Sequence, residues 1–216
     1  MHVLLARHGE TPWNRDGRYQ GHTDVALSET GEAQAASLGK RLASVTIHQA
    51  LASPLVRARR TAELALGSSR AALLRTDDGL KEISHGQWEG KLVTEIEQSH
   101  PELLKQWKHA PTATLPAGPR AESLQQVLDR AWPPFAAAVK RLEPNQTLLV
   151  VAHDAVNRAI LCRVLGLPLE RVWSFRQAPA TLNVLAGPSL EQLQVVRLND
   201  AEHVAPWHAE AVHVAV

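Results

Sequence analysis

An apolar run near the start of the chain, Val3-Leu4-Leu5, leads into Ala6-Arg7-His8-Gly9-Glu10-Thr11. The apolar residues predict a buried strand, and Gly9 predicts that the chain then turns into a loop. Ligands of α/β sheets bind in the crevice beyond the carboxyl ends of the strands. A guanidinium there donates a fork of hydrogen bonds to an anion, and a neutral imidazole offers a nitrogen lone pair. Two basic residues at the end of a strand are more often solvated surface residues than a binding site. Whether Arg7 and His8 bind an anion therefore depends on the rest of the chain.

The composition is that of an ordinary globular protein. The 216 residues, 44% hydrophobic and 21% charged, suit one large or two small domains. A formal net charge of +1 gives no overall attraction to nucleic acid or to acidic membranes, so we expect neither as a partner. The single cysteine, Cys162, excludes an intramolecular disulfide. The first residues lack the features of a signal peptide, and no apolar stretch has the roughly 20 residues that cross a bilayer. These features predict a cytoplasmic protein.

Strand-like and helix-like segments alternate along the chain. The strands are expected at residues 3–6, 50–52, 73–75, 147–151, 181–185 and 193–198. The helices are expected from the capping signal at Ser28 to about 43, from 55 to 66, from 122 to 142 and from 155 to 165. Pro133-Pro134 should kink or interrupt the third of these helices. The alternation predicts an α/β fold, with a mainly parallel central sheet between two helical layers.

One stretch differs in character from the rest. Residues 86–119 are richer in Glu, Gln, Lys and Trp, and they end in a run of prolines and alanines. We expect a helical, lid-like excursion at about 86–119 with a weaker core of its own, within a single domain over residues 1–216.

Two further junctions repeat the pattern of strand, polar tip and helix. After the second expected strand comes Ser53-Pro54-Leu55-Val56-Arg57, which carries an arginine in the first turn of a helix. Arg57, Arg59 and Arg60 cannot all face one ligand, because successive helix positions differ by about 100°. We expect Arg59 and Arg60 to be solvated surface groups. The strongest strand signal leads into Val151-Ala152-His153-Asp154. Helix N-termini attract anions, and Asp154 also suits the cap of its helix.

A loop punctuated by glycines supplies carboxylates. Either Glu82 or Glu89 could serve as an acid–base group, and their spacing does not decide between them.

These motifs together resemble the signature of the histidine phosphatase superfamily, the phosphoglycerate-mutase-like proteins. The matching residues occur in the family's order and cover almost the whole chain. They are Arg7-His8-Gly9-Glu10-Thr11; Asn14, Arg18-Tyr19-Gln20-Gly21, Asp24, Leu27-Ser28 and Gly31; Ser53-Pro54-Leu55, Arg57-Ala58 and Thr61-Ala62; Glu82, Gly86 and Trp88-Glu89-Gly90; Val151-Ala152-His153; and Leu198-Asn199-Asp200 with His203.

The resemblance implies a phosphoglycerate-mutase-like fold and a set of residue roles. His8 is the nucleophile that becomes a phosphohistidine, and Arg7, Arg57 and His153 surround the phosphoryl group. Glu82 is the acid and base, with Glu89 orienting its loop. No metal and no cofactor are implied. The expected substrate-binding residues are Arg7, His8, Asn14, Gln20, Gly21, Arg57, Glu82, His153 and Asp154.

One position departs from the family pattern. Many members have glycine directly after the second histidine, where this chain has Asp154. A carboxylate there repels a dianion unless it points away to cap the helix or to bond a neighbour. We therefore expect altered substrate choice with activity retained.

The resemblance leaves several alternatives open. We favour a phosphatase acting on a small phosphomonoester such as a sugar phosphate, a sugar-acid phosphate or α-ribazole phosphate. A cofactor-dependent phosphoglycerate mutase and an inactive phosphate-binding relative are the alternatives. Trp13, Trp88 and Trp107 are expected to contribute to the pocket. A homodimer is compatible with the sequence, which does not determine the oligomeric state. His203, His208 and His213 are spaced by five residues, which favours a solvated C-terminal segment over a metal site.

Overall fold

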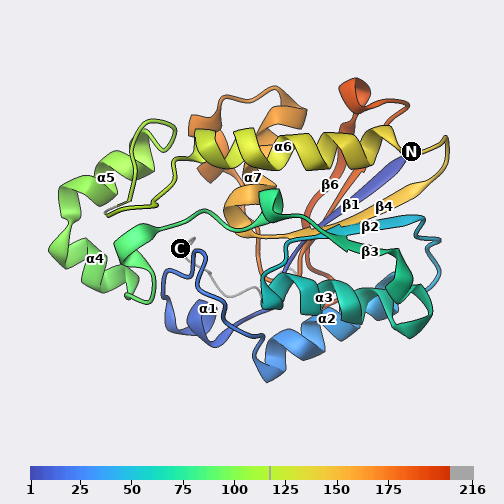
Figure 1. Ribbon diagram of the computed structural model, residues 1–216, viewed down its shortest axis with the longest axis horizontal. Coiled ribbons are helices and arrows are strands. Elements are labelled where there is room, and N and C mark those ends of the chain that lie inside the picture. Colours follow the sequence, from blue (N-terminus) through green and yellow to red (C-terminus); the bar gives the residue numbers. More distant parts are fainter. Residues whose placement is uncertain (117, 205–216) are drawn as a thin grey trace.

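A six-stranded sheet in the order β3-β2-β4-β1-β5-β6 forms the centre of the molecule (Figure 1). The structure is a computed structural model, and it describes residues 1–116 and 118–204. β1 pairs in parallel with β4, β4 with β2, and β2 with β3, whereas β5 and β6 are antiparallel additions on the other side of β1. The prediction of a mainly parallel sheet is confirmed. The strands are β1 (His2–Arg7), β2 (Gln49–Ala52), β3 (Leu74–Thr76), β4 (Thr147–Ala152), β5 (Leu182–Ala186) and β6 (Gln194–Asp200).

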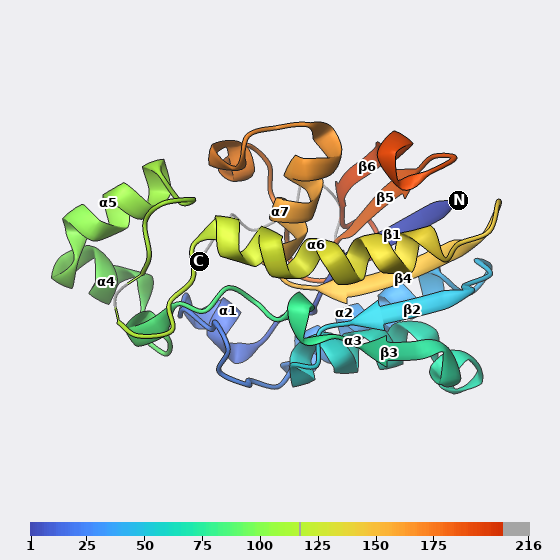
Figure 2. The same cartoon turned by 45° about the horizontal axis from the view of Figure 1, so that its top comes forward.

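Helices cover both faces of this sheet (Figures 1 and 2). They are α1 (Pro12–Asp16), α2 (Glu29–Arg41), α3 (Val56–Leu66), α4 (Val93–Ser99), α5 (Pro101–His109), α6 (Leu124–Lys140) and α7 (Asp154–Leu165). Short 3-10 helices lie at Ser68–Leu73, Asp78–Leu80, Gly86–Trp88, Leu169–Ser174 and Leu190–Gln192. Among the described residues, no helix has the length and apolar character needed to cross a membrane.

The alternation of side chains along the central strands creates two cores. On β1, Val3 and Leu5 join the cluster that packs against α6 and α7, while Leu4 and Ala6 join the cluster against α2 and α3. All four are buried, because a strand flanked by helices on both sides has no solvent face. The three-layer α/β/α architecture is therefore built on continuously apolar strands.

The starts of α2 and α7 differ in their capping. The hydroxyl of Ser28 accepts the amide of Gly31 at 3.0 Å, so the capping signal before α2 is confirmed. At the start of α7, the prediction that Asp154 caps the helix was wrong. His153 occupies the cap position without a side-chain bond, and Asp154 is the first helical residue.

The two prolines of α6 do not interrupt it. Pro133 and Pro134 lie within one continuous helix, although Pro134 has no N–H for the carbonyl of Arg130 four residues earlier. Gly79 packs against that carbonyl, since a Cβ at Gly79 would come within 2.4 Å of its oxygen. The tertiary packing of α6 therefore overrides the helix-breaking tendency of the prolines.

The α4–α5 excursion extends beyond the end of the sheet (Figures 1 and 2). Its apolar side chains do not form a separate core as expected. Trp88, Ile96, Leu104 and Trp107 are buried in the same cluster as the residues under α6 and α7. The indole rings of Trp88 and Trp107 meet edge to face with centroids 6.3 Å apart. The excursion is thereby continuous with the main core.

Two glycines allow the loop after β1 to lie against the first turn of α2. A Cβ at Gly9 would come within 2.5 Å of the carbonyl oxygen of Gly31. A Cβ at Gly31 would come within 2.0 Å of the carbonyl oxygen of Glu10. Both approaches are shorter than any side chain tolerates, so backbone contacts backbone here.

We predict that Gly31→Ala lowers the free energy of unfolding by about 1–3 kcal/mol, because the added methyl group must displace the backbone of Glu10. Urea denaturation monitored by circular dichroism measures the loss. Thr30→Ala, at the exposed neighbouring position, is the control and should change stability by less than about 0.5 kcal/mol. Equal stability of the Gly31 variant and the wild type would contradict the close-approach argument.

Candidate active site

The register of the two central strands brings two histidines together. β1 and β4 pair with Arg7 opposite Ala152, so His8 and His153 emerge side by side at the carboxyl ends of the strands. The amide of His8 donates to the carbonyl of Ala152 at 3.1 Å, and the two imidazole centroids are 5.1 Å apart. Residues 145 positions apart in the sequence thus share one crevice edge.

The hydrogen bond of His8 determines which of its nitrogens is available. Nδ1 lies 2.7 Å from the carbonyl oxygen of Gly9, which can only accept, so Nδ1 carries the proton. In the neutral ring, Nε2 then holds the lone pair. Burial lowers the pKa of His8 well below its ordinary value, and the charges of Arg57 and Arg7 lower it further. His8 is therefore a neutral base with a directed Nε2.

Arg57 reaches the site from the first turn of α3. It is fully buried, and its guanidinium donates to the carbonyls of Thr23 at 3.0 Å and Gly21 at 2.8 Å. Burial lowers its pKa to about 10, which leaves it protonated at neutral pH. Because its hydrogen-bond partners are neutral carbonyls, its charge is not cancelled by a bonded carboxylate.

Arg7 is held from the opposite side, by the segment before β5. One of its terminal nitrogens donates to the carbonyl of Gln177. The side chain of Gln177 exchanges two amide hydrogen bonds, of 2.7 and 2.9 Å, with Asn183 of β5, and Asn183 also donates to the carbonyl of Leu5 at 3.0 Å. This network orients the guanidinium beside His8.

His153 completes the cluster. Its Nε2 shares a hydrogen bond of 2.8 Å with the hydroxyl of Ser53, at the end of β2. Burial, followed by the charge of Arg57, lowers its pKa well below the ordinary value. Three buried nitrogens at this site have no hydrogen-bond partner among the described residues: Nδ1 of His153, Nε of Arg7 and Nε of Arg57. Buried polar atoms without partners are rare in proteins, and at this site they are available to an anion.

Glu82 approaches the same cluster from the loop after β3. One carboxyl oxygen accepts the amide of Ile83 at 2.9 Å, and the other accepts the amide of Asp154 at 3.1 Å. Burial raises the pKa of Glu82, and the negative charge of Asp154 raises it further. A carboxyl group with a raised pKa can hold a proton nearer to neutral pH.

The loop that carries Glu82 is fastened to α6 by Arg130. Its guanidinium donates to the carbonyls of Gly79 at 2.7 Å, Lys81 at 2.6 Å and Glu82 at 2.8 Å. It also bonds both oxygens of Glu122, at 2.7 and 2.8 Å. One side chain therefore holds three backbone carbonyls of the short segment 79–82 that ends at this carboxyl group.

The carboxylate of Asp154 is paired with arginines. It bonds Arg158 one helical turn later at 2.8 Å, and Arg7 lies 3.9 Å from the same oxygen. Arg158 is itself buried, and it also donates to the carbonyl of Val172 at 2.7 Å. The negative charge that replaces the usual glycine is thus compensated by a bonded neighbour.

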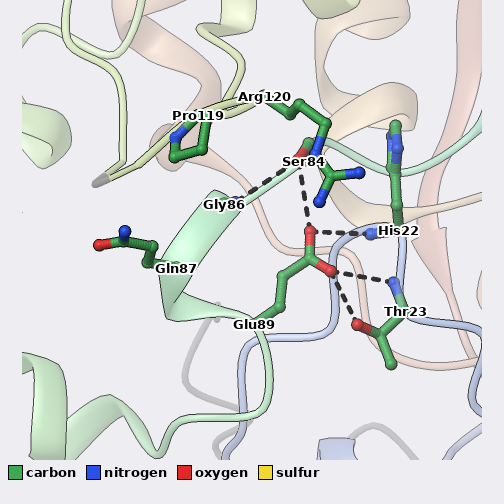
Figure 3. A pocket seen from close by; sticks show the side chains of 8 residues that line it. All are labelled: His22, Thr23, Ser84, Gly86, Gln87, Glu89, Pro119 and Arg120. Atoms are coloured by element: carbon green, nitrogen blue, oxygen red, sulfur yellow. Dashed lines mark hydrogen bonds between the residues drawn. The ribbon is translucent and has the colours of Figure 1, made fainter.

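Glu89 has a different environment from Glu82. Its carboxylate accepts the amide of Thr23 at 3.1 Å, the hydroxyl of Thr23 at 2.7 Å, and the amides of His22 and His85 at 3.1 and 3.2 Å. Figure 3 shows this carboxylate between the two loops that it joins. A Cβ at Gly21 would come within 2.1 Å of it, and Gly21 has a positive φ of 55°. Glu89 thus ties the two loops together.

The polar residues expected near the ligand make local contacts. The side-chain oxygen Oδ1 of Asn14 belongs to the capping box of α1, where it accepts a hydrogen bond of 3.1 Å from the backbone amide of Thr11. Gln20 is buried, and its side-chain oxygen Oε1 accepts a hydrogen bond of 2.9 Å from the hydroxyl of Thr11. Within the described part of the chain, the side-chain amide nitrogens of Asn14 and Gln20 donate no hydrogen bond. Gly21 contributes its carbonyl to Arg57.

A pocket of about 380 Å³ opens between the two loops that Glu89 joins (Figure 3). Its walls come from the loops that contain Gly21 and Glu82 and from the segment before α6. The lining residues are His22, Thr23, Ser84, Gly86, Gln87, Glu89, Pro119 and Arg120. Trp88 and Trp107, which were expected to line a pocket, are instead 0% and 4% exposed in the core. Both rings pack in the core cluster that continues under α6 and α7.

The C-terminal histidines form no metal-like group in the described part of the chain. His203 bonds the carbonyl of Ala180 at 2.8 Å and lies 3.2 Å from Arg41. His208 and His213 lie outside the described residues. Within residues 1–116 and 118–204, no group of three or more His, Cys, Asp or Glu side chains could hold a metal ion.

Sequence reasoning missed the residues that orient the site. Arg130 donates to the carbonyl of Glu82, Arg158 bonds the carboxylate of Asp154, and the carbonyl of Gln177 accepts a hydrogen bond from the guanidinium of Arg7. Arg130 and Gln177 carry no local signal, since a partner on another element leaves no periodicity in the sequence. Arg158 does have the i,i+4 spacing of a helical ion pair with Asp154. Glu122 with Arg130, eight residues later, could not be recognised as a pair from helical spacing.

Comparison with known proteins agrees with the geometry. The family model of the histidine phosphatase superfamily (branch 1) matches residues 3–201. The chain is 34% identical to phosphoserine phosphatase 1 of Hydrogenobacter thermophilus, over 99% of both chains. It is 34% identical to the adenosylcobalamin/alpha-ribazole phosphatase of Escherichia coli, over 82% of this chain and 85% of that protein.

Solved structures share the fold. The structure of Bacillus stearothermophilus YhfR superimposes with a TM-score of 0.85 at 32% identity, covering 94% of this chain and 99% of the other. A mycobacterial glucosyl-3-phosphoglycerate phosphatase superimposes with a TM-score of 0.80 at 27% identity, covering 92% and 98%. The phosphoglycerate-mutase-like fold expected from the motifs is confirmed.

We predict that His8 remains neutral at pH 6, where a free histidine is largely protonated, because its pKa is lowered by burial and by Arg57. Nitrogen NMR of the imidazole between pH 5 and pH 8 measures this and should also show the proton on Nδ1. Arg57→Met removes a positive charge that disfavours the imidazolium, so it should move the pKa of His8 upward. Titration of wild-type His8 near pH 6.5 would contradict the electrostatic account.

Proposed function

The chain belongs to branch 1 of the histidine phosphatase superfamily and is a phosphomonoester hydrolase, and from this premise we propose that it hydrolyses a small phosphorylated metabolite through a phosphohistidine on His8. The observation that carries this proposal is the directed Nε2 of His8 among buried nitrogens that have no partner in the described residues. A nucleophile needs its lone pair aimed at phosphorus, and the phosphoryl oxygens need donors around it.

In the first step, Nε2 of His8 attacks phosphorus and forms the P–N bond while the P–O bond to the leaving alcohol breaks. Arg7, Arg57 and His153 hold the phosphoryl oxygens and stabilise the charge of the transition state. Glu82 gives its proton to the leaving oxygen. The raised pKa of Glu82 supports this role, because the carboxyl group must be protonated when the ester binds.

In the second step, water attacks the phosphohistidine. Glu82, now ionised, takes a proton from the water, and the electron pair of the breaking P–N bond returns to Nε2 of His8. Inorganic phosphate leaves and the carboxyl group is again protonated. The same residue acts as acid and then as base, so each cycle restores the starting protonation state.

The relatives support a small polar ester as the substrate. Their names specify phosphoserine, 2-carboxy-D-arabinitol 1-phosphate and alpha-ribazole phosphate. Among the described residues that line the pocket between the two loops, most side chains are polar, and the imidazole of His22 is the only aromatic ring. A sugar phosphate or sugar-acid phosphate suits these walls better than an ester with a large apolar base. Asp154, turned toward Arg158, is compatible with retained activity.

We predict that His8→Ala abolishes both turnover and phosphoenzyme formation, because Nε2 of His8 is the proposed acceptor of the phosphoryl group. Rapid quench with a phosphorus-labelled ester, followed by digestion and mass spectrometry, measures the acid-labile label. His2→Ala, at the exposed opposite end of β1, is the control and should retain both activities. Label on another histidine in the His8 variant would assign the nucleophile elsewhere.

We predict that Glu82→Gln slows hydrolysis of an alkyl phosphate by roughly 10²–10⁴-fold, the range for positioned acid–base catalysis. Phosphorylation of His8 by p-nitrophenyl phosphate should decrease less, because its leaving group needs no proton. Phosphoenzyme should accumulate, since its hydrolysis lacks a base.

Glu89→Gln is the matched control. It disturbs the loop contacts, so the rates for alkyl and aryl esters should decrease by a similar factor. Dependence on the leaving group in the Glu89 variant, and not in the Glu82 variant, would reverse the assignment.

A further inference from the structure

Asp154 is a buried carboxylate beside the groups that carry the proposed chemistry. It directly follows His153, and its backbone amide donates to a carboxyl oxygen of Glu82 at 3.1 Å. Removing a charge from water costs free energy unless the charge is paired, and the glycine that many members of the family have here avoids that cost. The charge of Asp154 therefore distinguishes this site from the usual pattern of the family.

Arg158 holds this carboxylate in place. Its Nε donates to Oδ1 of Asp154 at 2.8 Å, and its Nη1 donates to the carbonyls of Val172, at 2.7 Å, and Phe175. The Cζ atom of the guanidinium also lies 5.5 Å from the centroid of the Trp173 ring. The segment before β5 thereby fixes Arg158, and Arg158 fixes the carboxylate of Asp154.

Charges of both signs act on the carboxyl group of Glu82. Burial raises its pKa and the charge of Asp154 raises it further, whereas the amide of Ile83 and the charges of Arg57 and Arg7 lower it. The two arginines that the phosphate needs therefore favour loss of the Glu82 proton in the free enzyme. Asp154 opposes them.

The two imidazoles and Arg130 add no net charge at this site. Burial and the nearby arginines lower the pKa of His8 and of His153 well below the ordinary value, so both rings are neutral near neutral pH. Arg130 of α6 donates to the backbone carbonyl of Glu82 at 2.8 Å, and its charge is balanced by its ion pair with Glu122. The protonation of Glu82 therefore depends on the carboxylate at the start of α7 and on the two phosphate-binding arginines.

We propose that Asp154 is a positioning residue: held by Arg158, its charge keeps a proton on Glu82 until the leaving oxygen of the ester takes that proton. The inference rests on the proposed function above, in which Glu82 protonates the leaving alcohol. The proton passes from Glu82 to the leaving oxygen, and Asp154 itself exchanges none. Such a role matters most for esters of alkyl alcohols, whose oxygen is a poor leaving group without a proton.

Asp154→Asn tests this role, because the amide keeps the size of the side chain and an oxygen that can accept from Arg158 while it removes the charge. Glu82 should then lose its proton at a lower pH. We expect kcat/KM for an alkyl ester such as glycerol 3-phosphate to begin to fall at a lower pH than in the wild type, and to be lower by roughly 10-fold at pH 8. Phosphorylation of His8 by p-nitrophenyl phosphate should change much less, because that leaving group needs no proton.

The second half-reaction should respond in the opposite direction. Hydrolysis of the phosphohistidine needs an ionised Glu82, so the Asp154→Asn variant should lose its label faster than the wild type at pH 5.5. Rapid-quench decay of the labelled phosphoenzyme measures this rate, and Glu82→Gln, which lacks the base, gives the background. A side chain that only supports the fold would instead slow both half-reactions at every pH.

Further variants complete the test. Asp154→Gly removes the same charge, so it should shift both half-reactions in the same directions, and it serves if the Asn variant fails to fold. Glu32→Gln removes a carboxylate that also bonds an arginine, Arg60, on the exposed surface of α2 and α3, and it should leave both pH profiles unchanged.

The possible failures can be told apart. Equal losses at every pH and on both esters, or unchanged pH profiles in a folded Asp154 variant, would overturn the proposal. Label on His8 of the wild type would then leave the phosphatase function standing. A wild type that forms no phosphoenzyme on His8 would overturn the proposed function itself, and the proposal with it.

Discussion

Burial of the Arg57 charge against neutral carbonyls is the constraint on which the site depends. A guanidinium removed from water needs hydrogen bonds, and here Gly21 and Thr23 supply them without supplying negative charge. The positive field therefore remains available to an anion and lowers the pKa of both imidazoles. A carboxylate bonded directly to Arg57 would stabilise the fold equally well but would cancel this field. The loop with Gly21 must therefore follow its observed path, because that path brings the carbonyls of Gly21 and Thr23 to the guanidinium of Arg57.

The remaining architecture keeps loops from different parts of the chain in register around that charge. β1 and β4 present the two histidines, Arg130 fastens the Glu82 loop to α6, and Glu89 joins that loop to the segment of Gly21. Asp154 contributes through its backbone amide, which bonds Glu82, and through its charge, which raises the pKa of the same carboxyl group. These contacts are buried and mutually dependent, so the effects of single substitutions among them will not be additive.

Much of the fold and of the candidate site could be predicted from local patterns. Continuous apolar runs such as residues 147–151 indicated strands buried on both faces, and Ser28 indicated the start of a helix. Predictions failed where packing outweighed local preference. The prolines of α6 are accommodated within a continuous helix, Trp88 is buried in the core, and Asp154 bonds Arg158 one turn away. In each case the deciding partner belongs to another turn or another element.

The sequence by itself determined the strand and helix order, the family and the candidate residues Arg7, His8 and His153, because those signals are carried by adjacent residues. The spacing of Glu82 and Glu89 did not show which of the two is the acid–base group. Only the tertiary structure distinguished their environments, since Glu82 is buried beside the imidazoles with a raised pKa while Glu89 is occupied by amides of two loops. Burial, pKa and hydrogen-bond satisfaction depend on contacts between distant segments, and a linear pattern does not contain those contacts.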